Sequence, residues 1–593
     1  MPNINDINGV TVANLAKLDA VLKANISKVN GLTLAAAFTG LLDTYTGADF
    51  GFSVRLLSSS YTGAAMRVIR YTAGGTGDAD EADISFVNNL ISLDSAISNA
   101  SAGVTATTLG QFINVGTVGG TTYTNPDSLT TTATAGLVKW YDQSGNGLDL
   151  TADSALLLGY IHDGTVNTDI NKENGVAIVK VNVTAVMTSG TYSYGTTNTV
   201  FSAIKNFTTA DSTLLRYPSG VLGYSTSGST SSADFGFGTT SYYQNGSEFQ
   251  SSSPTRGDMY TATQNQSLFS ILFGNPSSAT YLRIGRIGAA AMYSTHELIG
   301  YPNQTVSRTG VETNINSEYL IYQPTDAPTS GLLYDYGSAT GGTDAAAAYS
   351  VRQLSDKAVI AMRIRRDSDD EERNIGFDSN GDLDTTAISD FCDTANGYVV
   401  EWADQSTNGN HASQSTGTSQ PQIYNGTAVI TENSKPALDF DGTNALSISV
   451  TGTVTNFTAF FVRGFATYPN TFQNGFHYKA RGIGYNQAGG TGYRIAHLIN
   501  GTSSVQRADS YPTTTGQALD YFLNQSELYR NSASQTLQSG STYGANTTSV
   551  IGGWQESSQN ITATIQELII YESDESSNRT GIETDINGYF SIY

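Results

Sequence analysis

A single cysteine, Cys392, occurs among the 593 residues of the chain. One thiol cannot form an intrachain disulfide, and it cannot build a cysteine-based metal cluster. Charged side chains are also scarce, at 14% of the residues, and acidic residues outnumber lysine and arginine by 52 to 29. The resulting net charge of −23 argues against nucleic acid as a partner, and it disfavours binding to anionic membrane surfaces.

The chain also lacks long apolar runs. No stretch of about 18 apolar residues occurs, so we expect no transmembrane helix and no membrane insertion. The first residues, MPNINDINGV, have neither the basic nor the apolar region of a secretory signal. We therefore expect a protein that is released by lysis, assembled into a particle, or exported by a route that the sequence does not show.

Glycine is abundant, with 61 residues, and so are aromatic residues, with 34 Tyr and 23 Phe. Together with many Thr, Ser and Asn, this composition is typical of short strands joined by tight turns. In ALSISVTGTVTNFTAFFVRGF, Ala445–Phe465, apolar side chains alternate with Thr, Ser and Arg, as they do in strands. The length favours two or more domains. We therefore predict an all-β protein of at least two domains.

One phrase occurs twice: WYDQSGNG at Trp140–Gly147 returns as WADQSTNG at Trp402–Gly409. Three further parallels follow the same order along the chain, with spacings that differ by loop insertions. They pair Ser53–Arg70 with Ser350–Arg366, Thr197–Phe207 with Thr455–Phe465, and His296–Tyr322 with Gln566–Tyr593. Shared order with variable spacing indicates a duplicated domain.

The two copies are separated by QPTDAPTSG, which contains Pro324 and Pro328 and is typical of a short stiff linker. We predict domain one at residues 37–322, the linker at 323–331 and domain two at 332–593. Each domain is predicted to be two antiparallel sheets packed face to face, with a few short helices.

Helical spacing is restricted to a few places. A helix is predicted to begin after Asp384, which is a suitable N-cap. Each copy is predicted to close with a helix, because apolar residues recur there at intervals of four. These residues are Val311, Ile315 and Tyr319 in the first copy and Ile582, Ile586 and Phe590 in the second.

Residues 1–36 differ from the rest of the chain. INGVTV at Ile7–Val12 is echoed by VNGLTL at Val29–Leu34. The stretch between them, Ala13–Lys28, has Leu and Ile residues at helical spacing. This segment is too small to fold alone, so we expect it to pack against something else. It is either an attachment and assembly segment or an ordinary N-terminal arm of domain one.

The repeated phrase has the chemistry of a turn. Its Asp can accept hydrogen bonds from backbone amides two or three residues on, and its Asn-Gly suits positive φ. Its Trp would bury a large ring where the strand enters the core. A Ser-His-Asp triad does not fit both copies, because His411 has no histidine counterpart in Leu148–Leu150. The predicted turn residues are Trp140, Asp142, Asn146, Gly147, Trp402, Asp404, Asn408 and Gly409.

Val400–Gln414, VEWADQSTNGNHASQ, resembles the YDQSG-x-GNHLTQ stretch of the catalytic domain of family 54 α-L-arabinofuranosidases. The upstream segment Arg352–Arg366 and the closing helix are similar too. The resemblance covers most of both copies and implies two tandem concanavalin A-like, or LamG-like, jelly-roll sandwiches. The modules also resemble those of tailed-bacteriophage structural proteins, in the closing NRTGIETDINGYFSIY and in the ANISKVNG segment before them.

The catalytic residues of that family do not match. A retaining glycosidase needs two carboxylates about 5 Å apart. The resemblance implies an acid/base Asp directly after a Gly-Gly pair, where this chain has Trp554, and copy one has no acid between Tyr281 and Tyr293. It also implies a nucleophilic Glu in the sandwich strands, yet no glutamate lies between Glu432 and Glu527 or between Glu173 and Glu248. We therefore predict that the chain is not an enzyme.

Two binding features remain. DSNGDLD at Asp378–Asp384 offers oxygen ligands for calcium but lacks the Gly and Glu of an EF-hand loop, so a turn is the better interpretation and no cofactor is predicted. Trp554, Tyr485 and Tyr493 could stack on sugar rings, and the alternative for each is ordinary core packing.

The function predicted from these features is a bacteriophage virion protein, located on the virion surface after assembly in the host cytoplasm. It would be a head or tail fibre, spike or decoration component, docked to capsid or tail through residues 1–36. We expect a homo-oligomer, with host surface glycan binding as an added role. The alternatives are an arabinofuranosidase-type hydrolase or depolymerase of host polysaccharide, and a secreted bacterial lectin or adhesin.

Overall fold

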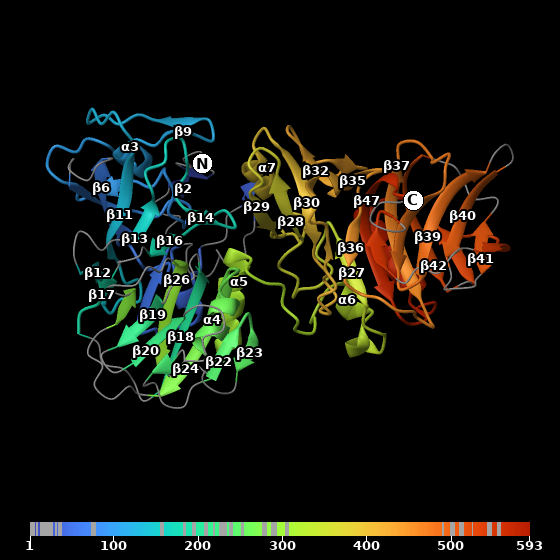
Figure 1. Cartoon of the computed structure of the whole chain (residues 1–593), viewed down its shortest axis with the longest axis horizontal. Coiled ribbons are helices and arrows are strands. Elements are labelled where there is room, and N and C mark those ends of the chain that lie inside the picture. The colour runs from blue at the N-terminus through green and yellow to red at the C-terminus, as the bar shows by residue number, and fades with distance from the viewer. Residues whose placement is uncertain are drawn as a thin grey trace.

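The computed structural model describes residues 6–7, 10–11, 28–29, 32–33 and 38–593, apart from 73–78, 154–158, 182–185, 192–196, 207–211, 218–219, 225–233, 236–240, 251–253, 275–281, 286–292, 303–306, 489–491, 499–503, 509–514, 525, 543–547 and 554–558. Figure 1 shows two β-rich units side by side, one coloured blue to green and the other yellow to red. We call the described part of residues 38–322 module one and that of 332–593 module two.

Eighteen strands of module one are hydrogen-bonded to one another in one continuous sheet. Its members are β5 Phe50–Ser53, β6 Met66–Thr72, β7 Asp80–Ile84, β8 Ile97–Ser98, β11 Ala133–Trp140, β12 Leu150–Ala152, β13 Gly159–His162, β16 Val179–Val181, β17 Val186–Thr188, β18 Thr197–Asn206, β19 Ser212–Tyr217, β20 Gly220–Tyr224, β21 Asp234–Phe235, β22 Ser241–Gln244, β23 Ser247–Gln250, β24 Ser267–Gly274, β25 Arg283–Gly285 and β26 Tyr293–Pro302. Two hairpins are separate, β9 Gly116–Val118 with β10 Thr121–Tyr123 and β14 Lys172–Glu173 with β15 Val176–Ala177.

The strands of module two form a closed set plus one separate hairpin, β33 Thr431–Glu432 with β34 Lys435–Pro436. The closed set is β27 Ala347–Ser350, β28 Met362–Arg366, β29 Glu372–Ile375, β30 Asn396–Trp402, β31 Ala412–Ser413, β32 Gln422–Asn425, β35 Leu438–Asp441, β36 Leu446–Ile448, β37 Thr458–Phe465, β38 Gln473–Tyr478, β39 Arg481–Ala488, β40 Gly492–Leu498, β41 Ser504–Ala508, β42 Gly516–Leu523, β43 Glu527–Arg530, β44 Ala533–Ser534, β45 Gln538–Thr542, β46 Ser549–Ile551 and β47 Thr562–Tyr571.

Helices are few, as the sequence predicts. Those in the described residues are α2 Leu41–Thr44, α3 Leu109–Ile113, α4 Arg256–Ala262 and α5 Arg308–Tyr319 in module one, and α6 Leu332–Asp335, α7 Thr385–Cys392 and α8 Arg579–Phe590 in module two, with 3-10 turns η2 Ser338–Thr340 and η3 Gly417–Ser419. Asp384 caps α7 by accepting a hydrogen bond from the backbone of Ala387, which confirms the predicted N-cap. In the part of the chain that the structure describes, none of these helices is long and apolar enough to cross a membrane.

The mostly β fold confirms the predicted class. In module two, β47 pairs with β27, β35 and β37, and β37 pairs in turn with β42. A second run of strands begins with β46 and β38 and faces the first, since the Phe461 and Phe476 rings lie 5.3 Å apart across the core. Every residue of β37 and all but two of β47 are buried, because the core covers one face and α8 packs beside β42 on the other.

The two hydrophobic cores are separate. The buried residues of the first core lie between Leu41 and Tyr319 in the sequence, and those of the second lie between Leu332 and Phe590. The predicted helical stripes, Val311, Ile315 and Tyr319 in α5 and Ile582, Ile586 and Phe590 in α8, are buried, and this confirms them. Between α5 and α6 the described chain has no regular element.

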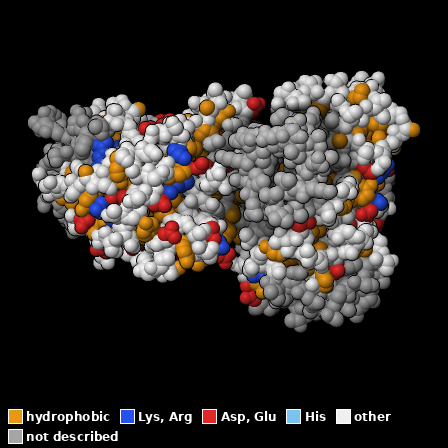
Figure 2. Space-filling model, turned by 180° about the vertical axis from the view of Figure 1, so that it is seen from behind, with side chains coloured by type: hydrophobic (Ala, Val, Ile, Leu, Met, Phe, Trp, Pro, Cys, Tyr) orange, Lys and Arg blue, Asp and Glu red, His pale blue; other side chains and the backbone are white. Residues whose placement is uncertain are grey.

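The N-terminal echo corresponds to two small hairpins. β1 Asp6–Ile7 pairs with β2 Val10–Thr11, and β3 Lys28–Val29 pairs with β4 Leu32–Thr33. The predicted helical stretch between them lies outside the described residues. On the molecular face in Figure 2, Lys and Arg lie beside Asp and Glu in small mixed groups rather than in a patch of one sign.

Candidate functional site

The repeated phrase forms the same hydrogen-bonded turn in both modules. Asp404 is fully buried, and its Oδ1 accepts backbone hydrogen bonds from Ser406 at 2.9 Å and from Ala348 at 2.8 Å. Its Oδ2 accepts from the backbone of Asn410 at 2.9 Å. Asp142 accepts the equivalent bonds from Ser144 at 2.9 Å, Gly51 at 2.9 Å and Leu148 at 3.0 Å. The turn therefore links the end of β30 to β27 in module two and the end of β11 to β5 in module one.

Two flanking side chains extend this attachment. Trp402 Nε1 donates to the carbonyl of Ser350 at 3.3 Å, and Gln405 Nε2 donates to that of Arg352 at 3.0 Å. Trp140 and Gln143 repeat these bonds in module one. Positive φ occurs at Gly147 and Gly409. Asn146 and Asn408 differ from the prediction, because they lack positive φ. Their side chains instead donate hydrogen bonds to the backbone carbonyls of Ala48 and Ala345, respectively.

The segment held by the turn carries a buried ion pair. Arg352 Nε lies 2.8 Å from Glu567 Oε2, and Ser350 Oγ donates to the same carboxylate at 2.6 Å. In module one Arg55 Nε lies 2.8 Å from Glu297 Oε2. The serine of the phrase is no nucleophile paired with a histidine, since Ser406 Oγ donates to Asp404 at 2.8 Å. The Asp-Gln-Ser phrase is therefore structural.

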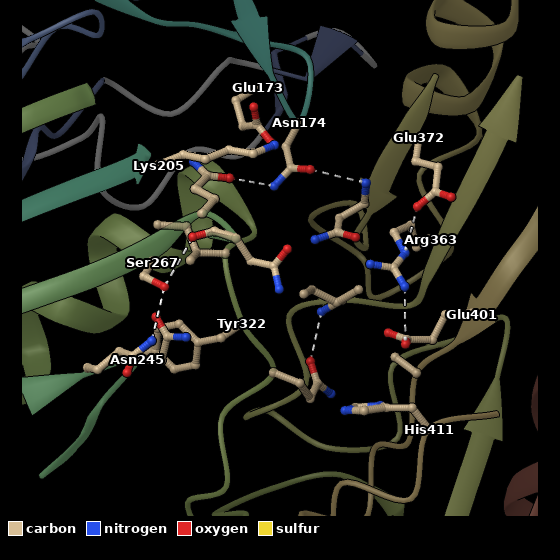
Figure 3. Close-up of a pocket in the computed structure, with 18 of the residues that line it drawn as sticks. Glu173, Asn174, Lys205, Asn245, Ser267, Tyr322, Arg363, Glu372, Glu401 and His411 are labelled. Atoms are coloured by element: carbon tan, nitrogen blue, oxygen red, sulfur yellow. Dashed lines mark hydrogen bonds and ion pairs between the residues drawn. The ribbon is translucent and has the colours of Figure 1, made fainter. Parts of the chain in front are cut away.

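A large cleft lies between the two modules, with a volume of about 1070 Å³. Figure 3 shows Glu173, Asn174 and Lys205 of module one on one side and Arg363, Glu401 and His411 of module two on the other. Most of the lining side chains are polar or charged, and Tyr322 is the single aromatic ring other than His411 among the described lining residues. Such a lining offers many hydrogen-bond donors and acceptors to a polar ligand.

The wall from module two contains two carboxylates on one arginine. Arg363 in β28 is directly opposite Glu401 in β30, and its Nη2 lies 3.4 Å from Glu401 Oε2. Its Nε lies 3.3 Å from Glu372 Oε2, which comes from β29 on the other side of β28. Because two carboxylates share one guanidinium, this group carries a net negative charge that faces the cleft.

His411 lines the same wall below Glu401 (Figure 3). Its Nδ1 lies 3.0 Å from the backbone nitrogen of Asp404 and can only accept that hydrogen bond. The proton of the neutral ring is therefore on Nε2, and no described residue accepts a hydrogen bond from Nε2. In module one, Asp149 accepts the equivalent bond from Asp142 at 3.0 Å.

The wall from module one is held by a hairpin, β14–β15. Glu173 forms an ion pair with Lys205, whose Nζ lies 2.6 Å from Glu173 Oε1. Asn174 Nδ2 donates to Gln266 Oε1 at 2.8 Å and to the carbonyl of Tyr319 at 3.1 Å. Gln266 in turn donates to Nδ1 of the buried His296 at 3.1 Å. Burial lowers the pKa of His296 to about 3, so the ring is neutral and acts as an acceptor there.

The end of module one and the linker are hydrogen-bonded to module two beside the cleft. Gln323 Oε1 accepts hydrogen bonds from the backbones of Val359 at 3.1 Å and Ile360 at 2.9 Å. The side chain of Asn374 in β29 donates to the carbonyl of Leu320 at 2.8 Å. Module two is thus hydrogen-bonded both to Gln323 in the linker and to Leu320 at the end of module one.

Of the three predicted sugar-stacking residues, the structure describes the side chain of Tyr485 alone. Tyr485 is fully buried, its ring packs 5.1 Å from that of Phe465, and its hydroxyl donates to Asp520 at 2.7 Å, so it offers no face to a sugar. Tyr493 is in β40, with a side chain outside the described residues, and Trp554 lies outside them altogether.

The acidic DSNGDLD segment is occupied by its own hydrogen bonds. Asp378 Oδ1 accepts from the backbones of Asn380 at 2.8 Å and Asp382 at 3.0 Å, and Asp384 caps α7. These backbone hydrogen bonds lower the pKa of Asp378, although burial works against them. In the described part of the chain, no group of three His, Cys, Asp or Glu residues could hold a metal ion.

Comparison with known proteins gives one family match: "Alpha-L-arabinofuranosidase B, catalytic" over residues 333–467. A solved family 54 α-L-arabinofuranosidase soaked with a cyclic sulfate inhibitor is 16% identical, with a TM-score of 0.32 over 43% of this chain and 65% of that one. An arabinofuranosidase complexed with arabinofuranosyl-α-1,2-xylobiose is 17% identical, with a TM-score of 0.32 over 43% and 64%. Trypanosoma rangeli sialidase is 10% identical, with a TM-score of 0.25 over 86% and 77%.

This chain therefore spans slightly less than two thirds of the length of those arabinofuranosidases. No curated protein matches it. The family match overturns the prediction that the chain is not an enzyme, because residues 333–467 match the model of an arabinofuranosidase catalytic domain. What the comparisons establish is a glycoside-hydrolase-like domain in module two.

The cleft residues were not predicted from the sequence. Arg363, Glu372, Glu401 and His411 all fall inside the matched region 333–467. For Glu401 and His411 one signal could have found them, namely the exchange of residues between the copies. Module one has Lys139 and Asp149, which pair at 3.4 Å, where module two has Glu401 and His411.

Proposed function

We propose that this protein is a glycoside hydrolase that binds a polysaccharide in the cleft between its modules. The observation that carries the proposal is the pair of carboxylates, Glu372 and Glu401, held on Arg363 inside the region that matches a glycosidase catalytic domain. These residues take the place of the carboxylates that the sequence lacks at Trp554 and in the sandwich strands. The first substrates to test are arabinofuranosyl linkages and host surface polysaccharides.

The chemistry follows from the charge of the group. Glycosidase transition states resemble an oxocarbenium ion, and carboxylates beside the sugar stabilise its positive charge. Two carboxylates on one guanidinium retain a net negative charge for that purpose. One of them would take a proton from the attacking water, and that proton would end on the departing sugar oxygen as the glycosidic bond breaks; Arg363 fixes both carboxylates in position. His411, with its proton on Nε2, would donate a hydrogen bond to a sugar oxygen.

The test is sugar release by the full chain from a panel of arabinofuranosides and bacterial polysaccharides. The double variant Glu372→Gln/Glu401→Gln should lose at least about 100-fold of the rate. The matched control is Glu81→Gln in module one, whose carboxylate binds Arg67 Nε at 2.6 Å, the counterpart of the Arg363–Glu372 pair outside the cleft. It should retain the rate. Full activity in the double variant, or no cleavage by the wild type across the panel, would refute the proposal.

A virion location is the second part of the proposal. It is supported by the resemblance of both modules to tailed-phage structural proteins and by the paired hairpins β1–β2 and β3–β4, which repeat within residues 1–36. A hydrolase carried on a virion would act on the polysaccharide of its host. Cryo-electron microscopy of purified particles checks this: we expect ordered density for residues 1–36 against a capsid or tail protein, and its absence from every particle would refute it.

A further inference from the structure

A second cavity, of about 450 Å³, lies between the modules on the other side of the joint. We call it the rear cavity. Leu320 and Val176 of module one and Val359, Arg373 and Phe377 of module two contribute to its lining. Asn174 and Asn374 border both this cavity and the cleft, so their mutual contact separates the two.

Arg373 in the rear cavity has no ionic partner. Its Nε is buried without a hydrogen-bond partner, and Arg373 takes part in none of the ion pairs found between described residues. The nearest aromatic ring, that of Phe391, is 6.0 Å from Cζ. Arg352 and Arg363, by contrast, each contact two carboxylates. Burial lowers the pKa of Arg373, and leaving its buried Nε without a partner costs free energy of folding.

The acidic residues around the rear cavity are bound to other groups. Asp378 accepts backbone hydrogen bonds within its own turn, and Asp384 caps α7. Glu318 lies 3.7 Å from Arg55. The charges of Asp390, Asp384 and Glu371 raise the pKa of Arg373, but none of these carboxylates forms an ion pair with it, so its Nε is available to an anion that enters the cavity.

The chain leaves room for this guanidinium at Gly175. A Cβ at Gly175 would lie 2.2 Å from Arg373 Cζ, closer than atoms can approach. The turn itself does not require glycine there, because the equivalent hairpin of module two has Ser434 with a φ of +64°. Gly175 has a φ of +78°, which itself favours glycine, and the missing side chain also lets hairpin β14–β15 lie against the Arg373 guanidinium.

We propose that Arg373 is the centre of an oxyanion-binding site in the rear cavity, and that it takes a carboxylate or phosphate group. Guanidinium groups bind both anions with two parallel hydrogen bonds. The ligand is an anionic sugar, such as a uronate unit of a bound polysaccharide, or a free inorganic anion. This site is independent of the proposed hydrolase activity, because it lies on the other side of the Asn174–Asn374 contact.

The experiment is thermal unfolding of the full chain with phosphate, glucuronate or glucose, at constant ionic strength set with chloride. Phosphate or glucuronate should raise the Tm of the wild type by about 2 °C or more, and glucose should not. A response to glucuronate alone identifies the sugar acid as the ligand, and a response to phosphate identifies a general oxyanion site. Arg373→Gln should abolish the response. Arg67→Gln, which removes a paired arginine of module one, should preserve it.

Two further results separate binding from a structural role. Without added anion, Arg373→Gln should be at least as stable as the wild type, because it removes an unpaired buried charge. Gly175→Ser, which introduces the residue of module two, should weaken the anion response by displacing the guanidinium. The proposal is overturned by an absent response in the wild type, by an equal response in Arg373→Gln, or by a fall of several degrees in that variant's Tm without anion.

Discussion

The two modules keep the same buried arginine–glutamate pair but surround it differently. In module one, Glu297 also accepts a hydrogen bond from Tyr319 at 2.9 Å, and His296 beside it is buried against the Tyr319 ring. In module two the corresponding residues are Phe590 and Gln566. Gln566 donates to the carbonyls of hairpin β33–β34 and so replaces the histidine as the attachment of that hairpin. The fold therefore depends on the ion pair and the turn, and it tolerates changes around them.

Differences that matter for function are concentrated where the modules meet. Glu401 and His411 replace Lys139 and Asp149, which adds a carboxylate and a hydrogen-bond donor to the cleft wall. Gly175 replaces the serine of the other hairpin, which makes space for Arg373. Duplication thus supplied two similar scaffolds, and the cleft combines an arginine–glutamate pair that both copies have with Glu401 and His411, which module one lacks.

The largest effect is expected from breaking the shared ion pair. Glu297→Gln and Glu567→Gln should each lower the free energy of unfolding by about 3–5 kcal/mol, because each leaves a buried arginine without its main partner. Glu567→Gln should cost less, since Arg352 keeps Asp585 at 2.7 Å whereas Arg55 keeps Glu318 only at 3.7 Å. Denaturant unfolding followed by hydrogen exchange in each module measures both. Equal or negligible costs would contradict the comparison.

The next effect is a pH dependence of module one. The pKa of His296 is lowered by burial to about 3 from an ordinary value of 6.5, so the unfolded chain binds a proton that the folded chain does not. The stability that module one has with a neutral His296 is fully present above pH 6.5, and it is lost progressively as the pH falls toward 3. At pH 5 the loss is about 2 kcal/mol.

His296→Gln, the residue of module two, should remove that loss. Module two should still lose stability in acid through His477, whose pKa burial lowers to about 4. The measurement is the unfolding free energy of wild type and variant between pH 7 and pH 4. An identical pH profile for the two proteins would show that His296 does not titrate as described.

A smaller effect is expected at Tyr319. Tyr319→Phe, which gives module one the ring of module two, removes the hydroxyl that donates to Glu297 at 2.9 Å. Because Arg55 and Ser53 still bind that carboxylate, the expected cost is about 1 kcal/mol. Equilibrium unfolding in urea measures it. A cost as large as that of Glu297→Gln would mean that the tyrosine, rather than the arginine, is the main partner.

The smallest change in stability is expected at His411. His411→Asp introduces the residue of module one, which accepts the same backbone hydrogen bond, so stability should change by less than about 0.5 kcal/mol. Binding of a cleft ligand should weaken by about tenfold, because the Nε2 donor is lost. Calorimetric titration with an oligosaccharide from the substrate panel tests this. Unchanged affinity would remove His411 from the proposed site.

Much of the fold could be predicted from the sequence because its signals are local. The duplicated phrase, the helical stripe of Ile582, Ile586 and Phe590, and the cap at Asp384 depend on residues close together in the chain. The cleft could not be predicted in this way. It depends on hairpin β14–β15 and Gln323 reaching module two, and these contacts join residues far apart in sequence.

The sugar-stacking residues show a second limit of the sequence. Tyr485 has the strand spacing that either a core or a binding aromatic would have, and only its burial between the sheets decides the matter. The family carboxylates raised the opposite difficulty. Their absence at the expected positions predicted no enzyme, whereas Glu372 and Glu401 lie in different strands and come together only through Arg363.

The most direct test of the cleft as the functional site is a crystal structure of the full-length Glu372→Gln/Glu401→Gln variant with an oligosaccharide bound. We predict sugar density between Arg363 and His411 on one wall and Lys205 on the other, with Nε2 of His411 within hydrogen-bond distance of a sugar oxygen. Sugar density confined to one module away from this cleft, with none beside Arg363, would contradict the proposal.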